Sequence, residues 1–207
     1  MVATLSTCPG FQKTKMLSAI IATNESERTL VATLAALVPG ATAGLLGEVV
    51  VTDGGSSDAT AEVADVAGCR VVSSSEPLGT RLKTAAASTH APWLLFLRAG
   101  SVPEAGWVEA TDRFIEATDA LDGAARAAVF RPPGAADLLH PRLSEVFALL
   151  RVIFGGGPKP EQGLLIARGF YNEIGGHPEG DGAETAILRK LGRSRVVMLP
   201  VGARQAR

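Results

Sequence analysis

Residues that build disulfide scaffolds and metal clusters are scarce in this sequence. Among its 207 residues there are two cysteines, Cys8 and Cys69, and three scattered histidines. Two thiols are too few for a disulfide framework, and the spacing of this pair matches no zinc-binding pattern. We therefore expect unreactive thiols in a reducing compartment and no metal site built from cysteine or histidine.

Long apolar runs and an excess of one charge are absent too. No stretch approaches the ~18 consecutive apolar residues of a membrane-spanning helix, and residues 1–16 lack the apolar core of a signal peptide. The 20 Lys and Arg against 21 Asp and Glu leave a formal charge of −1, which gives no electrostatic reason to expect a nucleic-acid partner. With 46% hydrophobic residues the composition is that of a globular protein. We expect a soluble, cytoplasmic protein that does not bind nucleic acid.

Short apolar segments alternate with helical patterns through the first hundred residues. The expected strands cover residues 16–23, 48–52, 69–73 and 92–97. The expected helices cover residues 24–38, 59–67 and 80–89, and the first of them is expected to end at Pro39-Gly40. This alternation predicts an α/β fold in which a mostly parallel sheet is covered by helices on both faces. At about 150 residues per domain, the length predicts a single domain with elaborations.

The pattern loosens beyond Ser101. Helices are expected at residues 103–117, 138–154, near Phe170-Tyr171 and at 183–191, and strands at 127–130, 163–167 and 195–199. The apolar helix at 138–154 leaves three interpretations open, namely packing on the sheet, binding of a lipid acceptor, and a homodimer contact. Trp107 is expected to lie on the side of its helix that faces the apolar core, rather than to stack on a ligand.

A loop that starts at Asp53 carries the clearest signal for chemistry. Ligands of parallel sheets bind beyond the carboxyl ends of the strands, and Asp53 ends an expected strand. Gly54 and Gly55 allow the backbone to approach a flat ligand, and the Asp53 carboxylate can accept hydrogen bonds from a base or from ribose hydroxyls. We predict a ligand contact for Asp53 and a helix-capping role for Asp58.

The glycine pattern of dinucleotide-binding proteins is missing. After the first expected strand the chain reads Ala22-Thr23-Asn24-Glu25 instead. A hydride-transfer enzyme is therefore disfavoured.

Two segments, 17–25 and 49–60, resemble the opening of family 2 glycosyltransferases of the GT-A fold. Residues 93–97, 161–163 and 174–178 are similar to later blocks of a small bacterial subgroup of that family, so the resemblance extends from about Leu17 to Pro200. It implies a single GT-A-like, Rossmann-like domain over residues 1–207. A nucleotide-binding half is expected at about 17–101, an acceptor half at about 102–200, and tails at 1–15 and 201–207.

The same resemblance implies an activity and a donor site. The expected reaction moves a sugar from a nucleotide-sugar to an unknown acceptor, with inversion. The nucleotide is assigned to Thr23, Glu25, Asp53, Gly54 and Gly55. Two other functions stay open: a catalytically inactive relative that acts as a binding or partner module, and a nucleotidyltransferase. The lack of a glycine-rich, lysine-containing phosphate loop after the first strand argues against the latter.

The chain departs from the family at the metal-binding motif. Subgroup members read Phe-Leu-His-Ala-Asp-Thr after the fourth expected strand, whereas this chain has Gly100 in place of the aspartate. Because Mg²⁺ and Mn²⁺ prefer hard oxygen ligands, we expect either ion to bind weakly. Arg98, Arg81 and Lys83 have two interpretations: they neutralise the diphosphate in place of the metal, or they are solvated surface cations of a decayed site.

The second departure concerns the catalytic base. Inverting members of the family use a Glu-Asp pair at the start of a late helix, and this chain has no such pair there. Matching the apolar positions of the helix puts Glu184 at the aspartate position, whereas a gap-free count puts Thr185 there. Glu184 is therefore the first candidate for the base and Asp181 the second, and each also fits the acid favoured at a helix start. Gln162 and His177 are candidate acceptor contacts.

Overall fold

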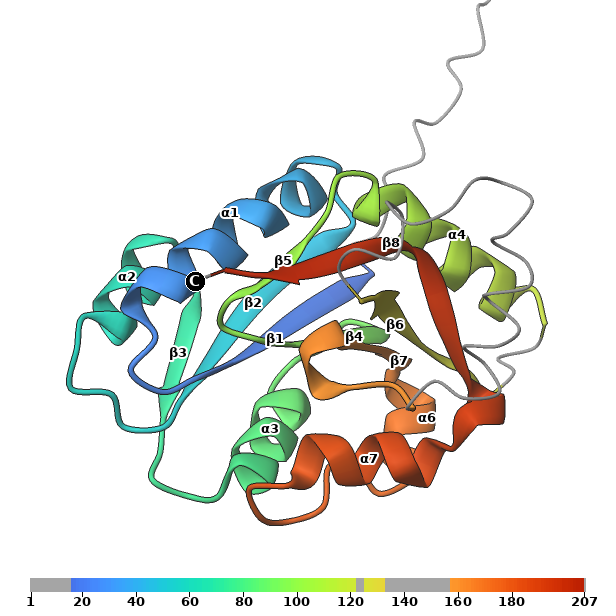
Figure 1. Ribbon diagram of the computed structural model, residues 1–207. Helices are drawn as coiled ribbons and strands as arrows, with labels where there is room; N and C mark the ends of the chain where they lie inside the picture. The colour runs from blue at the N-terminus through green and yellow to red at the C-terminus, as the bar shows by residue number, and fades with distance from the viewer. Residues whose placement is uncertain (1–15, 122–124, 133–156, 207) are drawn as a thin grey trace, which may run out of the picture.

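The computed structural model describes residues 16–121, 125–132 and 157–206, which form one eight-stranded sheet flanked by helices (Figure 1). The strand order is β3-β2-β1-β4-β7-β6-β8-β5. The strands are β1 (Leu17–Thr23), β2 (Leu46–Asp53), β3 (Arg70–Ser73), β4 (Trp93–Arg98), β5 (Ser101–Pro103), β6 (Ala127–Arg131), β7 (Leu164–Ala167) and β8 (Val196–Gln205).

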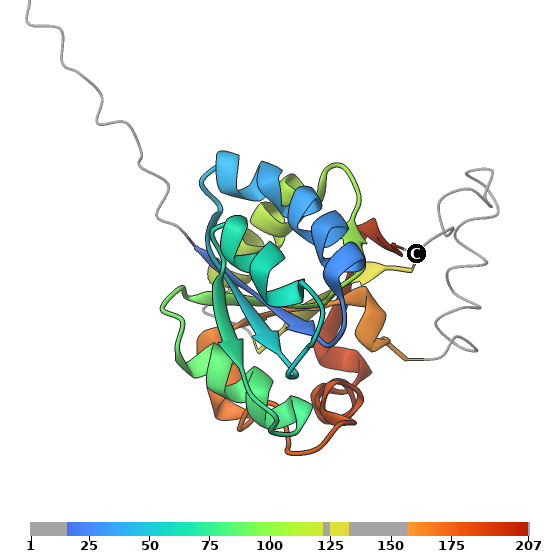
Figure 2. The same ribbon diagram turned by 90° about the vertical axis from the view of Figure 1, so that its left-hand side faces the viewer.

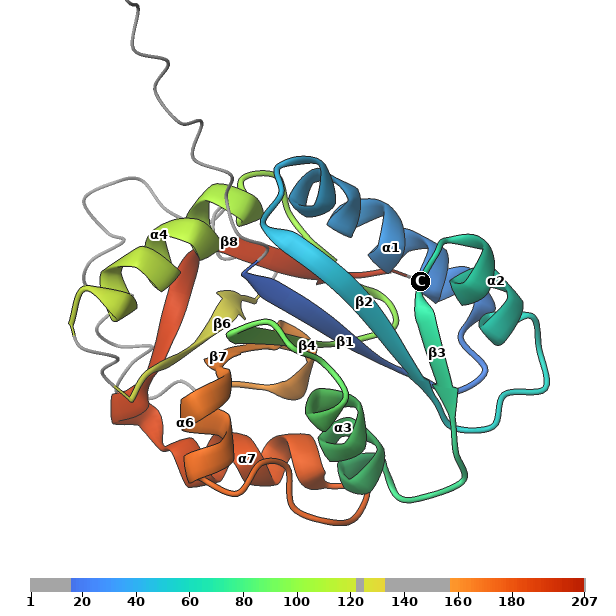
Figure 3. The same ribbon diagram turned by 180° about the vertical axis from the view of Figure 1, so that it is seen from behind.

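Strands β3, β2, β1 and β4 are parallel and lie side by side (Figure 3). Thr23 is in register with Asp53 of β2, and Ala22 is in register with Arg98 of β4. The carboxyl ends of three neighbouring strands therefore meet at one edge, which is where a parallel sheet binds its ligands.

The other half of the sheet mixes directions. β7 is antiparallel to both β4 and β6, β6 is parallel to β8, and β5 is antiparallel to β8. Four of the seven strand pairings are thus parallel, in agreement with the mostly parallel sheet that we expected.

Helices cover both faces of the sheet, as the alternating pattern predicts (Figures 1 and 2). One face carries α1 (Glu27–Thr42), α2 (Thr60–Val66) and α4 (Trp107–Asp119), whose buried side chains share one apolar cluster. The opposite face carries α3 (Leu78–Ala87), α6 (Arg168–Glu173) and α7 (Ala183–Leu191), which share a second cluster. Two short 3₁₀ turns are η1 (Pro160–Gln162) and η2 (Arg193–Arg195).

The apolar run of β1 follows from this layering. Ala19 and Ile21 belong to the first cluster and Ile20 to the second, and all three are fully buried. Successive side chains of a strand point to opposite faces, so a strand covered on both sides is apolar without alternation.

Helix α1 does not end at Pro39, where we expected it to stop. The proline removes one backbone donor, yet the Ala43 N–H donates to the Pro39 carbonyl at 2.9 Å and continues the helix to Thr42. The adjacent Gly40 has a packing role, because a β-carbon there would clash with the indole of Trp107. Trp107 is 2% exposed, which agrees with its expected place in the core.

The end of the chain is also more ordered than expected. Residues 201–205, which we expected to be a tail, belong to β8, and Ser101 to Pro103 of β5 pair with them. The expected helix at 138–154, with its lipid-acceptor and homodimer interpretations, lies outside the described residues. Within the described ranges, no helix is long and apolar enough to cross a membrane.

Candidate functional site

Asp53 ends β2 and is 1% exposed. Its Oδ1 accepts hydrogen bonds from Thr23 Oγ1 (2.9 Å) and Ser56 Oγ (2.5 Å), and its Oδ2 accepts from the backbone N–H of Gly55 (2.9 Å) and of Ser56 (2.8 Å). Burial acts to raise the pKa of Asp53, but these hydrogen bonds outweigh it and hold the pKa below its usual value. The four donors fill the acceptor positions of a carboxylate. Asp53 therefore shapes the loop after β2 in this structure, and a direct ligand bond would require an exchange of one of these donors.

Glu25, in the loop between β1 and α1, is tied to the same turn. Its Oε1 accepts hydrogen bonds from the Ser57 backbone N–H (2.7 Å) and the Ser57 hydroxyl (3.1 Å), and its own N–H donates to Ser56 Oγ at 2.8 Å. Glu25 is exposed and has a positive φ of 47°. The loops after β1 and β2 are thus fastened to each other before any ligand binds.

Asp58 has the structural role that its position predicts. It accepts hydrogen bonds from the backbone N–H of Thr60 at 3.0 Å and of Glu27 at 3.1 Å, which are the first residues of α2 and α1. The sequence indicated that Asp58 caps one helix, whereas its carboxylate accepts hydrogen bonds from the first residues of two helices.

Arg81 reaches from α3 to the same strand ends. One of its terminal nitrogens donates to the Thr52 carbonyl at 3.0 Å and to the Thr23 carbonyl at 3.4 Å. The other lies against Gly54, where an added β-carbon would stand 3.3 Å from it. The guanidinium is therefore held beneath the loop that the sequence assigned to the nucleotide.

A small pocket of about 40 Å³ adjoins this guanidinium. Thr52 and Arg81 line the pocket, and their Oγ1 and Nε atoms are buried polar atoms without a hydrogen-bond partner in the described structure. Buried polar atoms are almost always paired, so these two are exceptions beside the pocket. The pocket is lined by Thr52, Val72, Ser74, Glu76, Thr80, Arg81 and Thr84.

Lys83 does not share this position. It is an exposed residue of α3, and no hydrogen bond or ion pair joins it to the site residues that the structure describes. Of the cations expected near the diphosphate, Lys83 thus fits the interpretation as a solvated surface group.

Arg98 and Glu184 form the strongest electrostatic contact of the site. Arg98 is the last residue of β4, and its Nε and one terminal nitrogen both donate to Glu184 Oε2, with the Nε distance 2.7 Å. A second acid, Glu161, lies 3.9 Å from the other terminal nitrogen. Hydrogen bonding to Glu184 raises the pKa of Arg98 further above its usual value, so this guanidinium is a fixed cation.

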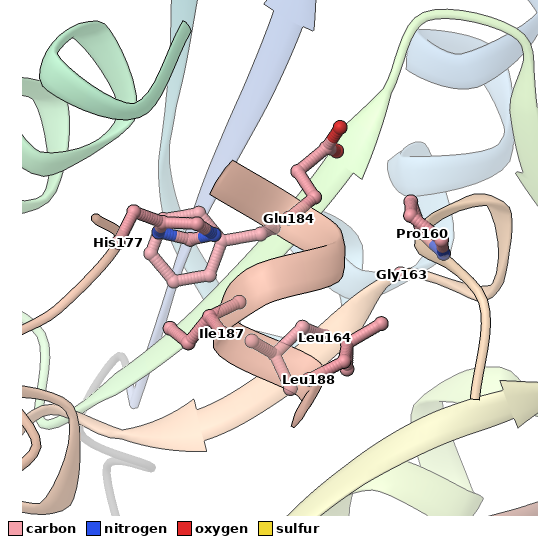
Figure 4. A pocket seen from close by; sticks show the side chains of 8 residues that line it. Pro160, Gly163, Leu164, His177, Glu184, Ile187 and Leu188 are labelled. Atoms are coloured by element: carbon pink, nitrogen blue, oxygen red, sulfur yellow. The ribbon is translucent and has the colours of Figure 1, made fainter. Parts of the chain in front are cut away.

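Glu184 owes its place to α7. It is the second residue of that helix, its side chain is 11% exposed, and the carboxylate points away from the apolar residues Ile187 and Leu188 (Figure 4). The positive end of the helix dipole favours an acid there. Asp181, the second candidate base, is exposed in the loop before α7 and has no hydrogen bond or ion pair with the residues described.

His177 and Gln162 lie inside the protein rather than at an open acceptor surface. His177 is 2% exposed, its Nδ1 lies 2.9 Å from the hydroxyl of Tyr171, and burial lowers its pKa to about 4. Gln162 donates to the Phe130 carbonyl at 2.6 Å and accepts from the Lys159 N–H at 2.8 Å. Both side chains are engaged within the protein, which differs from the acceptor contacts that the sequence suggested.

His177 and Glu184 nevertheless line one cavity of about 10 Å³ between α7 and the η1–β7 segment (Figure 4). The cavity has no room for a substrate as it stands. The histidine and the candidate base thus border the same small space.

The residues present do not fit a divalent cation at the family's metal position. Gly100 has a φ of +93°, and an added β-carbon would stand 3.3 Å from Gln205 Oε1 and 3.6 Å from the Ala206 carbonyl. The nearby acids Glu161 and Glu184 face Arg98 instead. Across residues 16–121, 125–132 and 157–206, no group of three or more His, Cys, Asp or Glu side chains is arranged to hold a metal ion.

The end of the chain contributes to this region, which the sequence did not indicate. The Ala206 N–H donates to the Gly100 carbonyl at 2.8 Å, and Gln205 Nε2 donates to Ser101 Oγ at 3.1 Å. Nothing in the pattern of residues 201–206 signals this contact, because it depends on pairing across about half of the chain.

Residues 18–149 match the family model described as glycosyl transferase family 2, and this span exceeds half of the chain. The chain belongs to glycosyl transferase family 2. The resemblance of the loop at Asp53 to this family is thereby confirmed. No curated protein sequence matches the chain.

Solved structures agree on the fold. Glucosyl-3-phosphoglycerate synthase from Mycobacterium tuberculosis, crystallised with Mn²⁺, UDP and glucosyl-3-phosphoglycerate, matches 98% of this chain and 79% of its own at 18% identity, with a TM-score of 0.64. Another crystal structure of that synthase matches 93% of this chain and 73% of its own at 21% identity, with a TM-score of 0.63. The crystal structure of a mycobacterial protein matches 93% of this chain and 68% of its own at 20% identity, with a TM-score of 0.62. The GT-A-like fold of this family member is therefore confirmed.

Proposed function

We propose that this chain transfers a sugar from a nucleoside diphosphate sugar to an acceptor hydroxyl, with inversion at the anomeric carbon. The observation that carries the proposal is the meeting of Arg98 and Glu184 beyond the end of β4. It places a cation for the departing diphosphate beside a carboxylate that can take the acceptor's proton. Membership in glycosyl transferase family 2 supports the same chemistry.

The nucleoside is assigned to the ends of β1 and β2. Thr23, Glu25 and Asp53 fix the two loops there, and Gly54 and Gly55 present backbone without side chains. The free Nε of Arg81 and the free hydroxyl of Thr52 supply a donor and a donor-acceptor for a polar base. The solved complexes of the mycobacterial synthase with UDP favour uridine as the nucleoside to test first.

The diphosphate is assigned to Arg98. A guanidinium binds phosphate oxygens in pairs and needs no metal to do so. In the transfer step Glu184 accepts the proton of the acceptor hydroxyl, and the acceptor oxygen forms a bond to the anomeric carbon. The bond from that carbon to the phosphate oxygen breaks, and its electron pair leaves with the nucleoside diphosphate, whose charge Arg98 stabilises. Attack from the side opposite the leaving group inverts the anomeric centre.

A panel of UDP-, GDP- and dTDP-sugars in the presence of EDTA tests the proposal. A donor at ~100 times its Kd is expected to stabilise the protein by about 2.7 kcal/mol, which raises the Tm of a chain of this size by roughly 5–11 °C. The same samples are assayed for release of the nucleoside diphosphate. Stabilisation together with release supports the proposal, and a panel without any stabilisation refutes it.

One observation favours a second candidate, a relative that binds nucleotides without catalysis. The Glu184 carboxylate is engaged with Arg98, and that of Asp53 with four internal donors, so neither is free at rest. Stabilisation by a nucleotide-sugar with no release of nucleoside diphosphate, in wild type and in Glu184→Gln alike, would support this candidate. A cytoplasmic location and an acceptor of lipid type remain predictions from sequence.

A further inference from the structure

Arg98 and Glu184 satisfy each other in the structure, although the proposed function needs both of them for substrates. Both donors on one side of the guanidinium, Nε and a terminal nitrogen, point to a single carboxylate oxygen of Glu184. A phosphate group bound by an arginine in the usual paired geometry uses this same side. The carboxylate therefore occupies the place that a diphosphate would take.

We propose that Glu184 occupies the diphosphate site of Arg98 in the resting protein and becomes available as the catalytic base only when the donor's diphosphate displaces it. This inference rests on the proposed function and adds an order of events to it. The donor binds first, and the acceptor loses its proton only afterwards.

Charge makes the exchange necessary. At neutral pH Arg98 contributes one positive charge, and Glu184 and Glu161 contribute one negative charge each, so the resting cluster carries −1. A diphosphate that joined the cluster without displacing Glu184 would lie against two carboxylates, and like charges in close contact repel each other. Displacement of Glu184 removes the nearer of the two carboxylates, and the diphosphate takes over its hydrogen bonds to the guanidinium.

The surroundings of both residues allow the exchange. The Arg98 side chain is 41% exposed, so an incoming diphosphate can reach it from solvent. Glu184 projects from the first turn of α7, where the helix N-terminus favours its negative charge after it leaves the arginine. The backbone of α7 is held by buried Ala183, Ile187 and Leu191, so only the side chain has to move.

The exchange also accounts for a site in which position 100 is a glycine instead of the family's metal-binding aspartate. The solved structures similar to this chain include a synthase crystallised with Mn²⁺ and UDP, whereas the residues here do not fit a divalent ion. A permanently charged guanidinium would attract anions at all times, and the Glu184 carboxylate neutralises it until a donor arrives.

Calorimetric titration of the full chain with UDP in EDTA tests this inference. Glu184→Gln removes the competing charge and is expected to bind UDP about fivefold or more tightly than wild type. Arg98→Gln is expected to bind it about tenfold more weakly, and the double variant to lose the gain seen in Glu184→Gln. The matched control is Glu179→Gln, which removes an exposed acid without a described contact and is expected to leave the affinity unchanged.

A second measurement uses the wild-type protein and does not depend on the folding of a variant. The NMR signal of the Arg98 Nε–H, assigned by its disappearance in Arg98→Lys, is expected to shift when UDP or inorganic pyrophosphate is added and to stay in place with uridine. A shift confined to the phosphorylated probes supports the exchange, and an unmoved signal overturns it.

The outcomes separate this inference from the function on which it rests. UDP binding that is equal or weaker in Glu184→Gln than in wild type overturns the exchange but leaves the proposed function in place. If wild type and Glu184→Gln both fail to bind UDP, GDP and dTDP, the proposed function fails and the exchange fails with it.

Discussion

Arg98 and Glu184 stand 86 residues apart in the sequence, and the Nε of the arginine lies 2.7 Å from a carboxylate oxygen of the glutamate. This contact joins β4 to α7, and thereby joins the half of the chain expected to bind the nucleotide to the half expected to bind the acceptor. In an inverting transfer the leaving group and the catalytic base lie on opposite sides of one sugar. The pair brings one residue of each kind to the same point of the fold, and the two side chains have to separate before a sugar can lie between them.

Glu184→Gln is expected to lower the turnover of a nucleotide-sugar by about 10²–10⁴-fold, because the amide cannot accept the acceptor's proton. Release of nucleoside diphosphate from UDP-glucose, with water as acceptor, measures this loss. Glu179→Gln controls for the removal of an acid near α7. A large loss in Asp181→Asn with normal turnover in Glu184→Gln would assign the base to Asp181 instead.

Arg81→Met is expected to destabilise the protein by about 1–3 kcal/mol, because it removes the hydrogen bonds to the carbonyls of Thr23 and Thr52. UDP binding should weaken together with stability. Lys83→Met, two residues away on the same helix and exposed, is expected to stay within about 0.5 kcal/mol of wild type. Urea denaturation measures both variants, and equal losses in the two would contradict the role given to Arg81.

Much of the fold could be predicted from local pattern. The run at 16–23 and the helix at 183–191 were predicted within a residue or so, because a strand buried on both faces is continuously apolar and an amphipathic helix repeats its apolar positions. The loop at Asp53 was placed correctly at a strand end for the same reason. Such signals depend on residues close together in sequence.

The partners of the site residues could not be predicted in this way. The sequence indicated that Asp53 stands beside a ligand, but nothing in it showed that Thr23 and Ser56 already fill its carboxylate. Likewise, Arg98 was expected near the diphosphate and Glu184 near the acceptor, and their mutual contact follows only from the packing of α7 on the sheet. Contacts between distant segments leave no periodic trace in a single sequence.

His177 gives a pH dependence of stability. Burial lowers its pKa to about 4, below the value of ~6.5 that an unfolded chain provides. The unfolded state therefore binds more protons between these two values, and the stability contributed by this residue is complete above pH 6.5 and lost as the pH falls toward 4. The loss amounts to about 3 kcal/mol over that interval.

Urea denaturation of wild type and His177→Asn between pH 7 and pH 4.5 isolates this contribution. The variant is expected to be less stable at pH 7 and to lose less stability on acidification. His90→Asn, which replaces an exposed histidine, is expected to follow the wild-type curve. Parallel curves for wild type and His177→Asn would show that the histidine is not held neutral by burial.

Mn²⁺ is expected to leave the affinity for UDP unchanged, because position 100 is a glycine instead of the family's aspartate and the nearby acids Glu161 and Glu184 face Arg98. Placing an aspartate at position 100 is not expected to restore Mn²⁺ binding. Gly100 has a φ of +93°, and the β-carbon of Gly100→Asp would lie 3.3 Å from Gln205 Oε1. Backbone strain alone is expected to lower the free energy of unfolding by about 1–3 kcal/mol.

Gly44→Asp separates strain from crowding, since Gly44 has a φ of +73° and no atom within 4 Å of an added β-carbon. We expect Gly100→Asp to be less stable than Gly44→Asp in urea, and calorimetry with UDP to show no gain from Mn²⁺ in wild type or in either variant. A clear Mn²⁺-dependent gain in wild type would mean that other oxygen ligands gather around the diphosphate. Arg98 would then be an addition to the metal rather than its replacement.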